Sequence, residues 1–551
     1  MELIPSICFF LVLCMVEIYS QAPEGSNANF PVIQIKDGSV RGRRSRTVGD
    51  QMVYYAFQGI PYAEPPIGNR RFRAPEKKSA WRGVLNATQD KSQCLQGGVP
   101  PQGSEDCLYV NVYTPNFKGK KLPVMAWIYG GGFNLGNSSY RGYGPDYLLE
   151  KDIVFVSFNY RLGIYGFGST RDASCPGNFG FKDQILALKW VQDNIGFFGG
   201  DPKKVTIFGQ SAGSASVSYL LQTDLAKDLF RAAIMESGTS LCLWALDRKS
   251  RETMFAVGQA LNVDTSSSTS LINGLRQIDS LQLQEVAFGM SINAIQENLL
   301  SGLVFGPTKE AGLVDKYSEL ALSQGRFLRK PVIIGFTSNE GVAVGGFPAI
   351  VREYFERYDS NISGLTPIDL TKNATKVMEA ATEIKSFYFG ASPIAGQIDV
   401  IVKFISDDLF NRAIRRTVID QSKYVPVYFY KFSYNGPLGS PNRSEEGVGH
   451  AEEINYLFRS YPNATIPSSD IITRTRMVKL WTNFAKFMNP TPSIDSTLDH
   501  IIWLPSNTIP NNQLYLDIDK ELEIKLNPFN RHMRFWDGIY EKYGDPPYDT
   551  Y

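Results

Sequence analysis

The sequence predicts an α/β fold with a large, mostly parallel central sheet, helices on both faces of that sheet, and helical insertions. Two near-continuous apolar runs, LPVMAWIYGGG (122–132) and IVFVSFNYR (153–161), are typical of strands that are buried on both faces. Further β-branched runs alternate with stretches of helical periodicity, which favours parallel strands joined by helices. The 551 residues contain no internal repeat and no low-complexity linker, so we expect one large domain over residues 21–551.

The predicted elements follow one another along the chain. The N-terminal part is β-rich, with strands expected within 32–42, 52–63 and 107–115. After the two apolar runs comes a helix whose apolar residues recur every three or four positions: Phe181, Ile185, Leu188, Val191 and Ile195. A buried strand over 203–209 leads into a helix from Ala212 to about Leu221. Later segments continue the sheet at 231–238, 330–341 and 425–436, and a terminal helix is expected over 529–543.

Residues 1–20 predict a secretory signal peptide. Their apolar stretch, Ile7 to Val16, is too short to span a bilayer and is followed by small and polar residues. No later segment is apolar over a spanning length, and the polar tail EKYGDPPYDTY is not a lipid-anchor signal. We therefore expect a secreted, extracellular protein without membrane insertion. The balance of 56 Lys and Arg against 55 Asp and Glu gives no field that favours nucleic acid.

Cysteines and glycosylation motifs agree with an oxidising compartment. Outside the predicted signal peptide four cysteines remain, and an even number favours disulfides. A bridge between Cys94 and Cys107 would close a short loop rich in Gly and Pro, while Cys175 and Cys242 could pair or remain thiols. Asn-X-Ser/Thr motifs predict a glycoprotein and begin at Asn86, Asn137, Asn361, Asn373, Asn442 and Asn463.

The stretch VTIFGQSAG (205–213) places Ser211 between two glycines, directly after a β-prone run. Glycine on each side permits a tight turn from strand to helix, because no Cβ crowds the backbone there. Such a turn would project Ser211 Oγ above the sheet edge and aim the N–H of Ala212 at an anion. A tight turn without chemistry is the alternative, but the strand before and the helix after favour a nucleophile.

A nucleophilic serine needs a base, and the chain has only three histidines. His500 precedes the β-prone run IIWLP and His532 lies in the predicted terminal helix, so we expect both to be structural or exposed to solvent. His450 follows a glycine-rich loop in GVGHAEE, a placement that suits a side chain reaching into a site. The acid that orients the base should lie between 211 and 450. Glu340 in TSNEG follows a strand at its carboxyl end, although other carboxylates fall in the same interval.

The segment WIYGGGFNLG offers donors for an oxyanion. Gly130, Gly131 and Gly132 follow a predicted strand, so their N–H groups can converge on one point. A phosphate-binding loop is the competing interpretation, but no Gly-Lys-Ser/Thr follows these glycines. Neither a metal nor an organic cofactor is expected.

Together these segments closely resemble the type-B carboxylesterase and cholinesterase family, whose members have the α/β-hydrolase fold. The resemblance runs from about residue 30 to the C-terminus, through motifs such as FQGIPYAEPP, SEDCLYVNVYTP, NYRLGIYGF, TIFGQSAG, TSNEG and GVGHAEE. It implies that Ser211 is the nucleophile, Glu340 the acid and His450 the base. It further implies an oxyanion hole of Gly131, Gly132 and Ala212, a Cys94–Cys107 disulfide, and a position near the triad for Ser237 of the ESG motif.

Two departures from the family pattern bear on the substrate. Cholinesterases hold a quaternary ammonium on a Trp within the first disulfide loop, but here that loop, CLQGGVPPQGSEDC, has no aromatic residue. They also carry Glu directly before the nucleophile, where this chain has the uncharged Gln210. Both differences argue against choline esters. Over its whole length the chain is similar to secreted insect carboxylesterases, including juvenile hormone esterases.

The resemblance therefore implies a secreted serine esterase that hydrolyses small hydrophobic carboxylic esters through an acyl-enzyme. One alternative is a hormone-specific esterase. A non-catalytic binding or adhesion protein is the other, although members of that kind usually lack a triad residue. Neither the natural ester nor the oligomeric state follows from the sequence.

Overall fold

The computed structural model describes residues 30–119, 121–298, 300, 302–314, 317–342, 348–441, 446–459 and 466–551. The predicted signal peptide and the glycosylation motifs at Asn442 and Asn463 lie outside these ranges.

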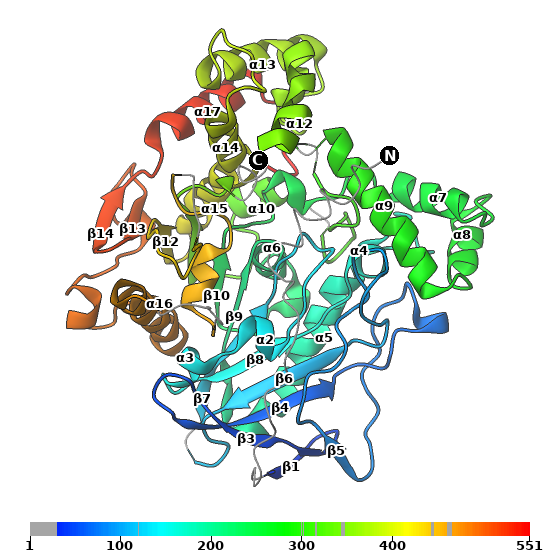
Figure 1. Cartoon of the computed structure of the whole chain (residues 1–551), viewed down its shortest axis with the longest axis vertical. Helices are drawn as coiled ribbons and strands as arrows, with labels where there is room; N and C mark the ends of the chain where they lie inside the picture. Colours follow the sequence, from blue (N-terminus) through cyan, green and yellow to red (C-terminus); the bar gives the residue numbers. More distant parts are fainter. Residues whose placement is uncertain are drawn as a thin grey trace.

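An eleven-stranded sheet forms the centre of the molecule, in the order β14-β13-β12-β11-β10-β9-β7-β8-β6-β4-β3 (Figure 1). Neighbouring strands run parallel from β13 to β8 and antiparallel at both margins, which confirms the expected α/β fold with a mostly parallel sheet. The strands are β3 (Arg43–Arg46), β4 (Val53–Pro61), β6 (Tyr109–Thr114), β7 (Leu122–Ile128), β8 (Val154–Phe158), β9 (Gly200–Gln210), β10 (Ala232–Glu236), β11 (Val332–Thr337), β12 (Val427–Phe432), β13 (Leu514–Ile518) and β14 (Leu522–Leu526). A smaller sheet of three strands holds β1 (Val32–Ile35), β2 (Gly38–Arg41) and β5 (Val84–Asn86).

The register of the central strands brings distant segments to one edge of the sheet. Gln210, the last residue of β9, is paired with Glu236, the last residue of β10. Glu236 is in turn paired with Gly335, near the end of β11. The segments that follow these three strands therefore leave the sheet side by side, at the carboxyl edge where α/β proteins place their sites.

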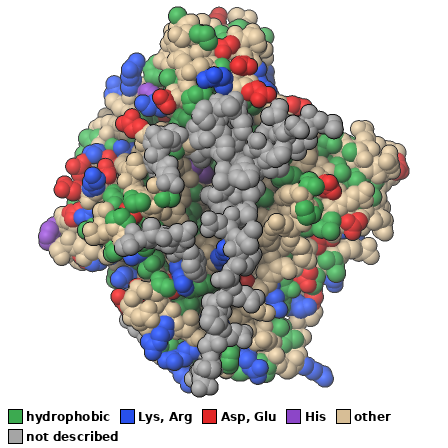
Figure 2. All heavy atoms as spheres, in the orientation of Figure 1, with side chains coloured by type: hydrophobic (Ala, Val, Ile, Leu, Met, Phe, Trp, Pro, Cys, Tyr) green, Lys and Arg blue, Asp and Glu red, His purple; other side chains and the backbone are tan. Residues whose placement is uncertain are grey.

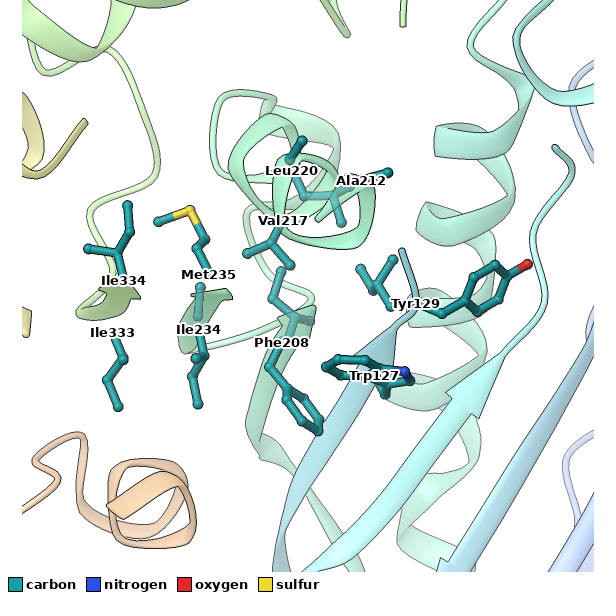
Figure 3. Packing of buried hydrophobic residues seen from close by; sticks show 14 of the residues in the cluster. Trp127, Tyr129, Phe208, Ala212, Val217, Leu220, Ile234, Met235, Ile333 and Ile334 are labelled. Carbon is teal, nitrogen blue, oxygen red and sulfur yellow. The ribbon is translucent and has the colours of Figure 1, made fainter. Parts of the chain in front are cut away.

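Helices cover both faces of these central strands. Figure 3 shows Met235 and Ile334 pointing toward α6 (Ala212–Leu220), whereas Ile234, Ile333 and Phe208 point to the opposite face. On that opposite face lies α16 (Ser468–Phe487), whose Trp481 reaches the side chain of Glu236, two residues after Ile234. The strands are buried on both faces because β-branched and aromatic residues occupy alternate positions on each side.

Most other helices are insertions between strands. Between β10 and β11 lie α7 (Ser250–Ala260), α8 (Ser268–Leu275), α9 (Ser280–Asn298) and α10 (Ser318–Ser323). Between β11 and β12 lie α12 (Pro348–Ser360), α13 (Ala374–Tyr388), α14 (Ile398–Ser406), a short π-helical turn, η7 (Asp407–Asn411), and α15 (Arg412–Ser422). The remaining helices are α2 (Tyr140–Tyr143), α3 (Asp146–Leu149), α4 (Gly163–Phe167), α5 (Phe179–Asn194) and α17 (Asn530–Tyr543). In Figure 1 the helices α12 to α14 and α17 gather at one end of the molecule, and α7 to α9 project at its side.

Most predicted elements agree with the structure, but one apolar run forms no strand and several strands, among them β3 and β5, were not predicted. The run IIWLP, expected to be β-prone, is extended chain outside any strand. The last two strands, β13 and β14, were also not predicted. In β14, four of the five residues are exposed and there is no apolar run, whereas all five residues of β13 are buried. The helices expected from Ala212 and over 529–543 are confirmed as α6 and α17.

One disulfide and two free thiols account for the four cysteines of the described residues. A disulfide joins Cys94 to Cys107, as expected, whereas Cys175 and Cys242 are buried free thiols. Figure 2 shows acidic and basic side chains interspersed over the described part of one face. No helix within the described residues has both the length and the apolar character needed to cross a membrane.

Candidate active site

A sharp turn between β9 and α6 presents Ser211. The serine adopts a left-handed φ of 57°, which is uncommon for a residue other than glycine, and its N–H donates to the carbonyl of Glu236 at 2.8 Å. A Cβ on Gly209 or Gly213 would lie 2.5 Å or 2.0 Å from the carbonyl oxygen of Ile128 in β7. The two glycines are therefore required, because only their bare backbones let the turn pack against the neighbouring strand.

The loop after β7 lies beside this turn. A Cβ on Gly130 would fall 2.9 Å from the Cβ of Ser211, so the loop and the serine are in close contact. Gly131 and Gly132 have left-handed φ values of 110° and 59°, which free rotation at glycine permits. Among the hydrogen bonds of the described residues, none uses the N–H of Gly131, Gly132 or Ala212. Three unused N–H groups thus remain available to an anion.

The loop after β11 positions Glu340. Its side chain is fully buried, and one carboxylate oxygen, Oε1, accepts the N–H of Thr337 at 2.8 Å. The next residue, Gly341, donates its N–H to Ser406 Oγ at 2.8 Å, which ties the loop to the end of α14. The backbone therefore fixes the direction in which the second carboxylate oxygen points.

His450 lies on a loop that is bound directly to the Glu340 loop. Val448 donates its N–H to Ser338 Oγ at 2.9 Å, and Asn339 donates its N–H to the Val448 carbonyl at 2.9 Å. These bonds bring His450 Nδ1 to 2.6 Å from Glu340 Oε2, across 110 residues of sequence. The imidazole is about one-fifth exposed, so one edge of the ring remains open to the site.

The other ring nitrogen of His450 faces the turn that carries Ser211. Nε2 lies 3.0 Å from the side-chain nitrogen of Gln210, the residue directly before the serine. No hydrogen bond joins Ser211 Oγ to His450 among the described residues. The structure thus places the imidazole between the Glu340 carboxylate on one side and the Gln210–Ser211 turn on the other.

Apolar side chains surround this arrangement. The ring of Phe410, from the π-helical turn η7, lies 4.8 Å from the ring of His450, centroid to centroid. Trp244 lies 5.7 Å from Phe410, and Phe133 lies 6.4 Å from Trp244. Leu303 approaches Gly132, since a Cβ there would lie 3.2 Å from its Cδ1. The site therefore has aromatic and aliphatic walls.

A buried acidic cluster, Glu236 and Glu453, lies near Glu340. Burial raises the pKa of Glu236 to about 8, although Trp481 donates a hydrogen bond to Oε1 at 2.6 Å. Burial, together with the charges of Glu236 and Glu340, raises the pKa of Glu453 well above its ordinary value. Ser237 Oγ lies 3.5 Å from Glu453, so the ESG serine contacts this cluster. Both carboxyls are therefore favoured in their protonated forms.

The two other histidines lie elsewhere. His500 is exposed next to Leu498 and Asp499, at the end of a short 3₁₀ turn. His532, in α17, places Nδ1 at 2.6 Å from Asp407 of η7. Of the three histidines, only His450 is brought to the serine turn.

The Cys94–Cys107 loop holds no aromatic side chain that could bind a cation. Among the described residues, no group of three or more His, Cys, Asp and Glu side chains could hold a metal ion.

Of the predicted glycosylation sites, Asn86, Asn361 and Asn373 are exposed, and Asn137 is half-buried with its side-chain nitrogen donating to Gln93 at 3.1 Å.

Sequence reasoning did not find Phe410 or Trp244 as walls of the site, nor the contact between Gln210 and His450. Phe410 comes from an insertion about 200 residues from the serine, so only the fold brings it there. Gln210 stood out in the sequence only as an uncharged residue beside the serine. For Glu236 the available signal was a carboxylate at the end of a buried strand, whereas Glu453, in a 3₁₀ turn after His450, had no such signal.

Comparison with known proteins relates the chain to one family of esterases. The model of the carboxylesterase family matches residues 29–536. The chain is 35% identical over 504 residues to a juvenile hormone esterase of Tribolium castaneum, with 84% of each chain covered. It is 34% identical over 515 residues to esterase FE4 of Myzus persicae, with 88% of each chain covered. The crystal structure of juvenile hormone esterase from Manduca sexta, with OTFP covalently attached, aligns with a TM-score of 0.82 and 28% identity, covering 93% of this chain and 100% of the other.

Proposed function

Because this chain belongs to the carboxylesterase family and is a carboxylic ester hydrolase, we propose that Ser211, His450 and Glu340 carry out its reaction. Ser211 acts as the nucleophile, His450 as the general base and Glu340 as the acid that orients the imidazole. Gly131, Gly132 and Ala212 form the oxyanion hole. The single observation that carries this proposal is the 2.6 Å contact between Nδ1 of His450 and the buried carboxylate of Glu340, with Nε2 turned toward the serine turn.

Acylation is the first half of the reaction. Ser211 Oγ attacks the ester carbonyl while its proton passes to His450 Nε2, so a C–O bond forms and the carbonyl oxygen becomes an oxyanion. The three unused N–H groups stabilise that oxyanion, and the negative Glu340 stabilises the imidazolium. Collapse of the intermediate breaks the bond to the alcohol oxygen, which leaves with the proton that His450 returns.

Deacylation repeats these steps with water. His450 removes a proton from the water as it attacks the acyl carbon, and the same N–H groups hold the second oxyanion. The bond from the acyl carbon to Oγ then breaks, Ser211 recovers its proton, and the carboxylate product is released. No metal or organic cofactor takes part in either half.

The walls of the site support a hydrophobic ester as substrate. Phe410, Trp244, Phe133 and Leu303 present apolar surface close to the imidazole and the glycine loop. A quaternary ammonium would find no aromatic residue in the Cys94–Cys107 loop and no charge at Gln210. We therefore propose that the substrate is an ester whose alcohol portion carries no charge, and that either its acyl chain or its alcohol portion is apolar.

A hormone ester is a second, narrower candidate. Relatives in two insects are named juvenile hormone esterases, and this chain shares about a third of its residues with the one from Tribolium castaneum. Comparing kcat/KM for a juvenile hormone with values for simple aryl and alkyl esters separates a hormone-specific enzyme from a broad carboxylesterase. A ratio of about 10² or more in favour of the hormone, worth about 3 kcal/mol of transition-state binding, would establish the narrower function.

We further propose that the protein is secreted after removal of residues 1–20 and is glycosylated at exposed motifs. The Cys94–Cys107 disulfide supports an oxidising compartment. The exposed positions of Asn86, Asn361 and Asn373 support modification there. Mass analysis of the protein recovered from culture medium, before and after glycosidase treatment, tests both statements.

Hydrolysis of a short-chain aryl ester by the wild type and by Ser211→Ala tests the proposed site. We expect the variant to lose at least about 10⁴-fold in kcat, because the acyl-enzyme cannot form. Gln192→Met is a suitable control, since the Gln192 amide binds the carbonyls of Pro202 and Leu229, away from the serine turn. Equal rates for the wild type and Ser211→Ala would refute the proposed nucleophile.

A further inference from the structure

We propose that Gln210 is a positioning residue whose side-chain amide donates a hydrogen bond to Nε2 of His450 in the free enzyme and yields this position to Ser211 when substrate binds. The inference rests on the proposed role of His450 as general base. Gln210 is the last residue of β9 and is only 4% exposed. Its side-chain nitrogen lies 3.0 Å from Nε2.

The chemistry of the two groups fixes the direction of this hydrogen bond. A carboxamide nitrogen donates and cannot accept, so Nε2 must be the acceptor and must carry a lone pair. The remaining ring proton of a neutral imidazole then belongs to Nδ1, which donates it to Glu340 Oε2 at 2.6 Å. Glu340 and Gln210 therefore select the same tautomer from opposite sides of the ring, and it is the tautomer that can accept a proton from serine.

The contact with Glu340 also selects the orientation of the Gln210 amide, because a carboxylate accepts the Nδ1 proton and leaves Nε2 with its lone pair. A Cβ on Gly130 would lie 2.9 Å from Gln210 Oε1, so the amide oxygen lies against the glycine loop while the nitrogen lies against the imidazole. The opposite orientation would set the amide oxygen against the Nε2 lone pair, which is repulsive for this tautomer. Gln210 thus contacts both the oxyanion loop and the general base.

The lone pair of His450 Nε2 accepts a hydrogen bond first from Gln210 and then from Ser211. Nε2 accepts the amide of Gln210 in the structure, and Ser211 Oγ has no hydrogen-bond partner among the described residues. The reaction requires that the same lone pair accept the proton of Ser211. Gln210 therefore holds the ring in place and keeps its base form hydrogen-bonded between turnovers, and Ser211 replaces it as the ester binds.

This role predicts how substitutions change the pH profile of kcat/KM, whose acid limb reports the protonation of the free base. A donor to Nε2 favours the neutral ring, so Gln210→Met, which cannot donate, should move the acid limb to higher pH by about half a unit to one unit. Gln210→Glu has nearly the same shape but its carboxylate accepts a hydrogen bond from a protonated Nε2, and its negative charge favours the imidazolium. Its acid limb should move further, by about one to two units.

Other titratable groups near His450 are the same in all variants. Glu340 faces the ring from the loop after β11, and Glu452 and Glu453 follow His450 in its own segment. Glu236 lies in the acidic cluster on β10, and η7 contributes the uncharged Phe410 to the face of the ring. A shift between the wild type and a Gln210 variant is therefore assigned to position 210.

The experiment measures pH profiles of kcat and kcat/KM for one aryl ester with the wild type, Gln210→Met, Gln210→Glu and a matched control. Gln192→Met is that control, because it removes a glutamine whose amide binds the carbonyls of Pro202 and Leu229, remote from the site. We expect shifts in the acid limb of kcat/KM in the order wild type and control, then Met, then Glu, with a loss of about three- to thirtyfold in kcat/KM for the Gln210 variants at neutral pH.

Unshifted acid limbs in both Gln210 variants would overturn the proposal, even if their rates fell, because a packing role lowers rate without moving the limb. If Gln210→Met does not fold, the profile of Gln210→Glu decides alone, since its side chain fills the same space. Ser211→Ala separates the two proposals. An inactive Ser211→Ala with unshifted Gln210 profiles refutes only the role of Gln210, whereas an active Ser211→Ala refutes the proposed site itself.

Discussion

Two histidine–carboxylate pairs in this molecule have the same geometry and different surroundings. Nδ1 of His450 lies 2.6 Å from Glu340, and Nδ1 of His532 lies 2.6 Å from Asp407. Each carboxylate is buried, and each imidazole is between one-fifth and one-third exposed. The first pair lies at the carboxyl edge of the central sheet, and the second joins α17 to the turn η7.

The difference lies in what else each imidazole contacts. The second nitrogen of His450 faces Gln210 and the serine turn, with the unused N–H groups of the glycine loop close by. The ring of His532 instead packs edge-on against Phe387 and Tyr388, at centroid distances of 5.3 Å and 5.4 Å. A short contact between His and a carboxylate is therefore no sign of catalysis by itself. Catalysis also needs a nucleophile and oxyanion donors at the other nitrogen.

The same substitution in each pair should have opposite effects on rate and stability. In Glu340→Gln the amide oxygen remains on the Thr337 N–H, so the NH₂ group turns to Nδ1 of His450 and forces the tautomer that cannot accept the serine proton. We expect kcat to fall about 10⁴-fold while the melting temperature changes little.

Asp407→Asn removes a carboxylate that accepts hydrogen bonds from Tyr388, Asn411 and His532. Its activity should stay within about threefold of the wild type, while its free energy of unfolding falls by about 1–3 kcal/mol. Assays with an aryl ester and thermal unfolding of both variants check the comparison. A loss of rate in Asp407→Asn as large as that in Glu340→Gln would show that the two pairs are not functionally distinct.

The next largest effect on kcat is expected from the glycine loop, whose N–H groups lie beside the His450–Glu340 pair. Gly131→Ala would place a Cβ 2.2 Å from the carbonyl oxygen of Leu135, at a φ of 110° that side chains rarely adopt. The loop must then shift, and we expect the loss of oxyanion stabilisation to lower kcat by about 10²–10³. Gly390→Ala is the control, since Gly390 also has a left-handed φ, 61°, but no atom lies within 4 Å of the added Cβ.

At Gly390 the φ of 61° lies in the left-handed helical region, where a Cβ costs about 1 kcal/mol, whereas the φ of 110° and the clash at Gly131 force the loop itself to shift. The control therefore shows the effect of an added Cβ that leaves the glycine loop unchanged. Steady-state kinetics with one aryl ester, alongside melting temperatures, make the comparison. If Gly131→Ala kept the rate of Gly390→Ala, the loop would not supply the oxyanion donors.

The sequence predicted the parts of the site that depend on local pattern. Glycines around Ser211 indicated the sharp turn, and the structure shows that a Cβ at Gly213 would lie 2.0 Å from a backbone oxygen. The alternation of buried strands and helices indicated the parallel sheet, and hence the edge where the three loops meet. The scarcity of histidine and the glycine-rich loop pointed to His450 as the base, whereas the choice of Glu340 among several carboxylates also rested on the resemblance to a family.

Features that depend on contacts between distant segments could not be predicted from local sequence patterns. The pairing of β13 with β12 is set by tertiary register, for example Tyr430 opposite Leu516, and β14 is an exposed edge strand without an apolar run. The run IIWLP is apolar enough for a strand, yet Trp503 donates its N–H to the side chain of Thr491 instead of to a neighbouring strand. The His532–Asp407 pair, likewise, joins residues 125 positions apart, and no local pattern distinguishes it from the proposed catalytic pair.

The smallest expected effect is on the pH dependence of stability and concerns the buried carboxyls near each histidine–carboxylate pair. Asp408, next to Asp407, is paired with Arg412 at 2.8 Å, whereas Glu236 and Glu453 behind the first pair have no cationic partner among the described residues. Burial raises the pKa of Glu236 from 4.5 to about 8. Between these values the folded protein holds a proton that the unfolded chain releases, so this group's contribution to stability falls as pH rises from about 4.5 to 8 and is constant above that.

Glu236→Gln should remove this pH dependence, because its amide keeps the acceptor for Trp481 and does not titrate. Calorimetric unfolding of the wild type and the variant at pH 5, 6, 7 and 8 gives the difference in stability at each pH. We expect the variant to gain on the wild type as pH rises, by at most about 1.4 kcal/mol per pH unit and a few kcal/mol in all. Since every other titrating group is common to both proteins, a difference that stays constant with pH would show that Glu236 is ionised alike in the folded and unfolded states. The first pair would then tolerate a second buried negative charge beside Glu340, and its surroundings would differ less from those of Asp407 than the structure indicates.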